Sequence, residues 1–172
     1  MLGAGSLAAI SFRGGSAQTL FSDVDTRSGL SIRFGLAAGA TSTGSSNIFM
    51  GSFAGRNASP TSTIALGTYA GESATGTRLV LIGTEAGRYA SATDSLVVGS
   101  SAGQFLAGSQ HVVLGARAGR LATGSGDSDT MLGCAAGERA IDMRGSNVIV
   151  GARAGWGAAA LSGSVIVGFG AA

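Results

Sequence analysis

The chain repeats a short run of apolar residues that ends at a glycine, nine times between residues 30 and 172. Successive glycines of this kind lie 16 residues apart five times, and then 18, 18 and 17 residues apart. In the first eight copies alanine and glycine follow at the third and fourth positions after the glycine, as in GSFAG and GARAG. We call these nine residues the anchor glycines: Gly35, Gly51, Gly67, Gly83, Gly99, Gly115, Gly133, Gly151 and Gly168.

Each repeat is predicted to form one coil of a parallel β-solenoid. Sixteen residues are too few for a helical repeat, but they suffice for short extended segments joined by tight corners. About nine coils stacked at ~4.8 Å would make a rod roughly 40 Å long. The anchor glycine and the glycine four residues later are predicted to take positive φ, with the alanine between them facing inward. We therefore expect an all-β chain, with residues 30–172 as the β-solenoid repeat domain and residues 1–29 as a short N-terminal β cap or docking segment.

The side chains before each anchor glycine fall into columns that would stack along the rod. Residues one and three before the anchor share a face of a strand and are apolar, so we expect them to form the core. The inward set would include Ile48, Met50, Leu66, Ile82, Val98 and Leu114. The residue two before the anchor would then face outward, although it is apolar in eight of nine coils. An outward apolar column predicts self-association along a trimer stripe of Phe49, Leu81, Val97, Val113, Met131, Ile149 and Ile166.

The repeat resembles those of two groups of surface proteins. A mostly polar column, four residues before the anchor, opens motifs such as NIFMGSFAG and NVIVGARAG. These motifs resemble the head repeat of trimeric autotransporter adhesins and the repeats of bacteriophage tail-fibre and spike proteins. The resemblance implies a left-handed parallel β-roll, a side-by-side homotrimer, and a role on a virion or cell surface. The asparagine usual in the family opens the motif only at Asn47 and Asn147, and neither a coiled-coil stalk nor a membrane anchor is recognisable.

Composition narrows the choice of partners. Glycine accounts for 31 residues, yet the apolar content of 45% argues against a disordered linker. Eleven basic residues, all arginine, against nine acidic ones give a net charge of +2, from which we expect no nucleic-acid partner. Apolar runs of three or four residues predict no membrane insertion. The start of the chain lacks the basic and apolar segments of a signal peptide, so secretion by that route is not expected.

No set of residues suggests catalysis. His111 is the single histidine and Cys134 the single cysteine, so neither a catalytic triad nor a zinc site can be assembled. The acidic pairs Asp23–Asp25 and Asp127–Asp129 lack further calcium ligands and are interpreted as solvated turns. His111 is interpreted as a turn residue. We expect no enzyme activity, no catalytic residue, no cofactor and no metal.

Two other columns predict contacts between coils. Five residues after the anchor, opposite charges alternate, which suggests an ion-pair ladder of Arg56, Glu72, Arg88, Gln104, Arg120, Glu138 and Trp156. Aromatic residues also fall in equivalent positions of neighbouring coils, Phe53 with Tyr69 and Tyr89 with Phe105. We interpret them as stacked ladders, with a sugar-binding aromatic strip as the alternative.

The two 18-residue coils indicate where a partner would bind. Insertions in solenoids form surface loops that often carry the binding face. The candidate partner-binding residues are Asp127, Asp129, Arg139, Arg144 and Trp156. We expect a virion structural protein of a tailed bacteriophage, released by lysis. It would be a trimeric fibre or spike on tail or capsid. Residues 1–29 would contact other virion proteins, and the long turns would contact a host surface glycan. A capsid decoration (cement) protein and the head of a bacterial trimeric adhesin stay as alternatives.

Overall fold

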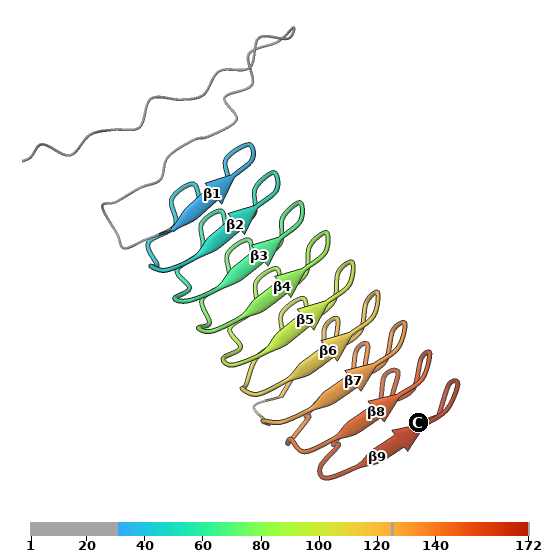
Figure 1. Ribbon diagram of the computed structural model, residues 1–172. Coiled ribbons are helices and arrows are strands. Elements are labelled where there is room, and N and C mark those ends of the chain that lie inside the picture. Colours follow the sequence, from blue (N-terminus) through green and yellow to red (C-terminus); the bar gives the residue numbers. More distant parts are fainter. Residues whose placement is uncertain (1–30, 125, 172) are drawn as a thin grey trace, which may run out of the picture.

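The computed structural model describes residues 31–124 and 126–171, so the predicted segment 1–29 lies outside the described residues. The described residues contain no helix and form nine strands in one sheet (Figure 1). The strands are parallel and follow one another in chain order. They are β1 (Ile32–Phe34), β2 (Ile48–Met50), β3 (Ile64–Leu66), β4 (Val80–Ile82), β5 (Leu96–Val98), β6 (Val112–Leu114), β7 (Thr130–Leu132), β8 (Val148–Val150) and β9 (Val165–Val167).

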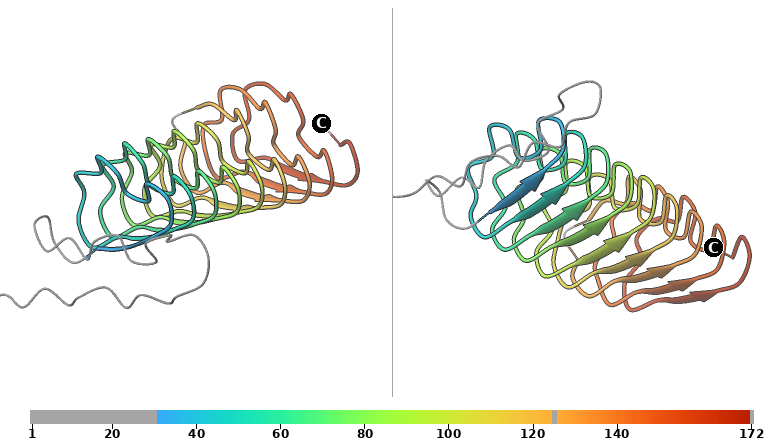
Figure 2. Two further views of the ribbon diagram at one scale, coloured as in Figure 1. Left: turned by 90° about the horizontal axis from the view of Figure 1, so that it is seen from above. Right: turned by 45° about the horizontal axis from the view of Figure 1, so that its top comes forward.

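The coils stack in the register that the repeat predicts. Ile48 of β2 pairs with Ile64 of β3, one period further along the chain, and every later pair keeps the equivalent alignment. The strands therefore lie along one side of a rod, and the turns close each coil on the other sides (Figure 2). The predicted all-β parallel solenoid is confirmed.

After β1–β4 and β6–β8 the chain runs through three overlapping β-turns. Each turn closes with a bond from the backbone N–H of its fourth residue to the carbonyl of its first, and its third residue has positive φ, as in a type II turn. In the second coil these bonds are Ala54 to Gly51 (3.2 Å), Arg56 to Phe53 (3.2 Å) and Ala58 to Gly55 (3.3 Å). Alternate amides bond to the neighbouring coil instead, as Gly55 does to Ala70 (2.9 Å). The turns thus satisfy their own backbone groups while stacking.

Side chains alternate between inside and outside along these turns, which explains the Ala-Gly pair of the repeat. Ala54 points inward and is fully buried. A Cβ at Gly55 (φ +61°) would lie 2.4 Å from the ring of Phe49, so no side chain fits there. Phe53 also has positive φ (60°), but its ring packs on the outer surface against Tyr69. The predictions of positive φ at both glycines and of an inward alanine are confirmed.

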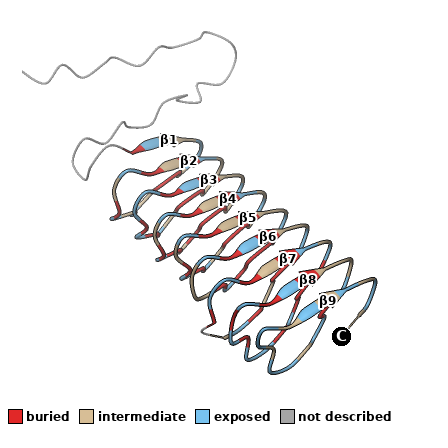
Figure 3. Ribbon diagram, turned by 60° about the horizontal axis from the view of Figure 1, so that its bottom comes forward, coloured by how far each residue is buried: buried red, intermediate tan, exposed pale blue. Residues whose placement is uncertain are grey.

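The predicted assignment of the two strand faces is wrong. The middle residue of each strand faces inward, and Phe49, Leu81, Val97, Val113, Met131 and Ile149 of the proposed trimer stripe are 0% exposed. Ile166, in β9, is partly buried against the same core. The first and third residues are exposed or partly exposed instead, and pale blue and tan stretches run along the strands in Figure 3. The trimer stripe is therefore the core of the chain, and Met50 and Ile82, which were expected inside, are exposed.

A buried polar column explains why the faces are reversed. In seven coils the residue four before the anchor is polar and buried, and its side chain accepts a hydrogen bond from the backbone N–H of the same position in the next coil; Leu79 is the apolar exception, and Ser164 belongs to the last coil. Asn47 Oδ1 accepts from Thr63 (2.9 Å), and Asp129 Oδ1 accepts from Asn147 (3.0 Å). Because alternate residues share a face, this column brings the middle strand residue inside with it. Its polar side chains are satisfied by backbone donors, so the rod buries them without loss.

The outer side of the sheet is almost wholly apolar. Of its two outward columns only Thr130 is polar, and none of the eighteen side chains is charged. We call this surface the outer sheet face. Its most exposed members are Ile32, Met50, Ile64, Ile82, Val112, Leu132, Val148, Val165 and Val167.

Candidate binding cleft

The turn side of the rod carries the predicted ion-pair ladder. Glu72 is almost fully buried and accepts from Arg56 Nε (2.9 Å) on one side and from Arg88 Nε (2.7 Å) on the other. Burial opposes the charge on Arg88, but the pKa of Arg88 is raised because its interactions with Glu72, Tyr89 and Glu85 together outweigh burial. Further along, Arg120 bonds to Glu138 (3.1 Å). The ladder prediction is confirmed for these residues.

The aromatic pairs also stack as predicted. The rings of Phe53 and Tyr69 are 5.0 Å apart and nearly parallel, and those of Tyr89 and Phe105 are 5.1 Å apart. The guanidinium of Arg88 lies over Tyr69 and Tyr89, at 5.2 and 4.9 Å from the ring centres. These rings are therefore covered in part by the ladder, which favours the structural interpretation over a sugar-binding strip.

We expect Glu72→Gln to destabilise the rod by about 2 kcal/mol, because Arg56 and Arg88 would then face each other without the shared carboxylate. A shift in the midpoint of urea unfolding measures the effect. Asp94→Asn is the matched control, since Asp94 pairs with Arg78 in full contact with solvent and its loss should change little. Equal shifts for the two variants would contradict a structural role for the buried carboxylate.

Charge is distributed unevenly along this side of the rod. Between residues 53 and 105, the outward turn positions carry Arg56 and Arg88 against Glu72 and Glu85, and these charges cancel. The equivalent positions from 117 to 156 carry four arginines against Glu138 alone, a local charge of +3. The C-terminal half is thus a concentrated positive surface on a chain of low overall charge.

A cleft of about 680 Å³ opens in this positive half. Its residues all come from the turns and none from the strands. Arg120 is held by Glu138 and by Gln104 (3.2 Å), whereas Trp156 ends the ladder and is 50% exposed. The cleft is lined by Arg117, Arg120, Cys134, Ala135, Glu138, Arg139, Arg153, Trp156 and Gly170.

Of the five residues predicted to bind a partner, the structure brings only Arg139 and Trp156 together in the cleft. Asp127 is exposed and accepts a bond from the Ser109 amide (2.8 Å) on another side of the rod. Arg144 is exposed and bound to Asp142 (2.7 Å), and this hydrogen bond lowers the pKa of Asp142. Neither lies in the cleft.

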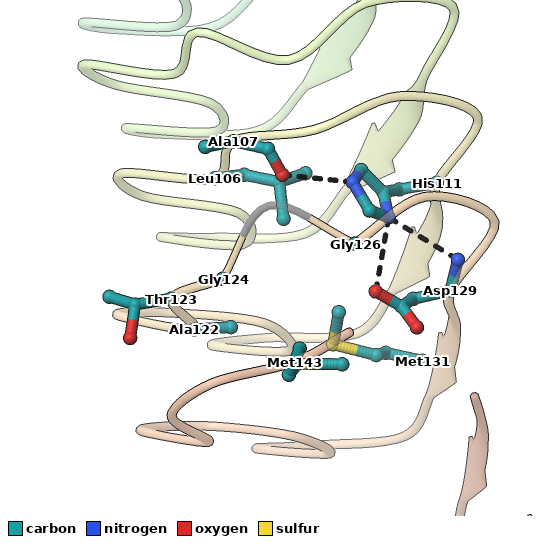
Figure 4. A pocket seen from close by; sticks show the side chains of 10 residues that line it. All are labelled: Leu106, Ala107, His111, Ala122, Thr123, Gly124, Gly126, Asp129, Met131 and Met143. Atoms are coloured by element: carbon teal, nitrogen blue, oxygen red, sulfur yellow. Dashed lines mark hydrogen bonds and ion pairs between the residues drawn. The ribbon is translucent and has the colours of Figure 1, made fainter. Parts of the chain in front are cut away.

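The prediction for Asp129 as a surface contact is wrong. Its side chain is buried in the inward polar column, next to the buried His111, so Asp129 is not the solvated turn that was expected. His111 Nε2 lies 2.9 Å from the carbonyl of Ala107, and Nδ1 accepts from the amide of Asp129 at 3.3 Å (Figure 4). The hydrogen of the ring is therefore on Nε2. The adjoining cavity measures about 10 Å³, roughly the room for one water molecule.

The two long turns pair with each other. The amide of Gly126 donates to the carbonyl of Met143 (3.0 Å), and that of Ser146 donates to Asp127 (2.8 Å). Met143 is buried and enlarges the core at this level. The extra residues of one coil are thus matched by those of the next, so both insertions belong to the wall of the rod.

Sequence reasoning did not assign Arg117 and Arg153 to a binding site, and it placed Arg120 in the ion-pair ladder alone. The available signal was the count of charges at the outward turn positions, which is balanced before residue 105 and positive after it.

Nowhere in residues 31–124 and 126–171 do three histidine, cysteine or acidic side chains gather as metal ligands would, and no helix there could span a membrane. Cys134 is exposed at the cleft. The sequence matches no protein-family model, no curated protein and no solved structure.

Proposed function

We propose that the protein is the rod of a trimeric fibre or spike on the virion of a tailed bacteriophage, with a role in attachment to the host surface. The observation that carries this proposal is the outer sheet face, a continuous apolar surface on a protein whose turn side is ionic. Nine strands at ~4.8 Å, each with three residues at ~3.3 Å, give this face roughly 400 Å² in projection. This is as large as the largest apolar patch of a typical monomer, and such patches are often functional.

Two further copies of the same chain are the proposed partners. The face is built from one pattern that repeats in register from strand to strand, so an identical rod laid alongside it in parallel meets the same pattern at every level. Three copies, the number that the resemblance to adhesin and tail-fibre repeats implies, would turn these faces toward a common axis. The ionic ladder and the cleft would stay on the outside, because no strand residue contributes to either.

Light scattering on the purified chain tests the association. We expect a mass of about three times the 16.6 kDa of one chain. Ile82→Asp combined with Val112→Asp should lower the mass to that of one chain, because each substitution puts a charge on the outer sheet face. The control is Arg78→Gln, which changes an exposed side chain that lies outside the strands. A wild-type chain that is monomeric at micromolar concentration would rule out the trimer.

Mass spectrometry of purified phage particles tests the virion role. Peptides of this chain should be present at a constant ratio to the other structural proteins. A chain recovered from bacterial envelopes and missing from particles would favour the adhesin head. Antibody labelling that covers the capsid shell evenly would favour the decoration protein.

A further inference from the structure

We propose that the cleft between Arg117, Arg153 and Trp156 binds an acidic sugar, a unit of a glycan that carries a carboxylate or phosphate group. The inference deepens the proposed function, which supplies the source of the glycan as the host surface. The site itself depends only on one chain, so it can be tested apart from the virion role.

The arginines of the cleft indicate an anionic ligand. Arg120 is already held by Glu138, but Arg117, Arg139 and Arg153 have no ion pair or side-chain hydrogen bond within the described part of the chain. All three are exposed. A guanidinium offers two parallel N–H donors to a carboxylate or phosphate, so three unpaired ones around a single hollow suit an anion.

The geometry leaves room for one sugar ring between two of these arginines. Arg117, Ala135 and Arg153 occupy the same position in three successive coils, two residues after the anchor. Ala135 is short and almost fully buried, and it lines the cleft between its long neighbours, which stand two coils apart, or roughly 10 Å along the rod. The cleft volume of about 680 Å³ lies within the usual range for small-molecule sites.

Trp156 favours a sugar over a simple anion. The indole of Trp156 is half exposed beside the arginines. In the two preceding coils the same position carries Glu138 and Arg120, which pair with each other. An exposed aromatic face packs against the C–H groups of a pyranose while its N–H serves as a hydrogen-bond donor. Charge recognition and ring stacking therefore meet in one site.

A nucleic acid fits the surface less well than a short acidic glycan. Polyanion binding needs a basic track that follows many phosphates. Here the excess of arginine over acidic residues at the outward turn positions is confined to residues 117–156. In the preceding coils the charges at these positions cancel.

Fluorescence titration provides a direct test, because Trp156 is the single tryptophan of the chain. The probes are digalacturonic acid, sialyllactose and glucose 6-phosphate, with lactose as the neutral sugar, inorganic phosphate as the simple anion and a thymidine oligonucleotide as the polyanion. We expect at least one acidic sugar to change the emission with saturation in the millimolar range or below. Lactose and inorganic phosphate should bind at least about 10-fold more weakly, and the oligonucleotide should not displace the sugar.

Arg117→Gln and Arg153→Gln should each weaken binding of that sugar about 10-fold, since each removes a charged hydrogen bond. Arg144→Gln, an exposed arginine outside the cleft, should leave the affinity unchanged. Circular dichroism should show all three variants folded. The proposal is overturned if no acidic sugar of the set binds, if lactose, phosphate or the oligonucleotide binds equally well, or if the cleft variants behave like Arg144→Gln. If the sugar test fails while light scattering shows a trimer and mass spectrometry finds the chain in phage particles, the sugar site is wrong and the proposed function is unaffected.

Discussion

Replacing Gly83 with valine is expected to destabilise the rod by about 3 kcal/mol or more, the sum of backbone strain and a steric clash. Gly83 has φ +129°, a region that β-branched residues do not occupy. A Cβ there would also lie 2.7 Å from the carbonyl carbon and oxygen of Gly99 in the next coil. Because both atoms are backbone, the coils themselves would have to separate. Thermal melting followed by circular dichroism measures the loss.

The last anchor glycine provides a matched control. Gly168 has nearly the same φ, +131°, but a Cβ at this position would meet only the side chain of Ala171, at 3.8 Å. Comparing Gly83→Ala with Gly168→Ala therefore separates the clash between coils from the backbone strain. We expect the Gly83 variant to melt well below the Gly168 variant. Equal melting temperatures would mean that the close approach of the coils does not limit the residue at the anchor.

The fold and the contacts between coils could be predicted because the repeat is regular. A constant interval places residues of equal offset above one another, whatever the shape of the coil. The charge on Glu72 and the rings of Phe53 and Tyr69 therefore had to meet their neighbours in the next coil. For the same reason the anchor glycines, with φ between +128° and +136°, all take one conformation.

The same pattern could not predict which residues of each strand face inward. All three strand positions are apolar in most coils, so hydrophobicity does not distinguish the inward residue from its neighbours. The polar column suggested that its members, such as Asn47 and Asp129, lie in solvent. What decides the matter is that each polar member of the column can accept a bond from the backbone of the next coil, which makes a polar residue suitable inside. The sequence signal for an inward column was that nearly all of its side chains carry a hydrogen-bond acceptor atom.

The cleft could be predicted only in part, for a similar reason. Long coils draw attention to Asp127 and Arg144, but the inserted residues pair with each other and leave the turn side unchanged. The cleft depends on a missing side chain, at Ala135, between two long ones. The repeat places Arg117, Ala135 and Arg153 in one column, but which side chains line a common cleft follows only from the stacked coils.

The two faces of β6 allow the corrected assignment to be tested with one residue type. Val113→Asp is expected to unfold the chain, because Val113 is fully buried and a carboxylate there has no partner. The expected loss is about 4 kcal/mol. Its neighbour Val112 is 37% exposed on the outer sheet face.

Val112→Asp should therefore keep the circular dichroism spectrum of a folded rod while lowering the mass measured by light scattering, since it disturbs the interface between copies and not the core. Val97→Asp, one coil earlier and equally buried, should reproduce the unfolding seen for Val113→Asp. The original stripe interpretation demands the opposite order, with Val97→Asp and Val113→Asp giving folded monomers and Val112→Asp unfolding the chain. A folded Val113→Asp variant would thus contradict the burial of the middle column. A Val112→Asp variant that is folded but unchanged in mass would instead remove the outer sheet face from the contact between copies.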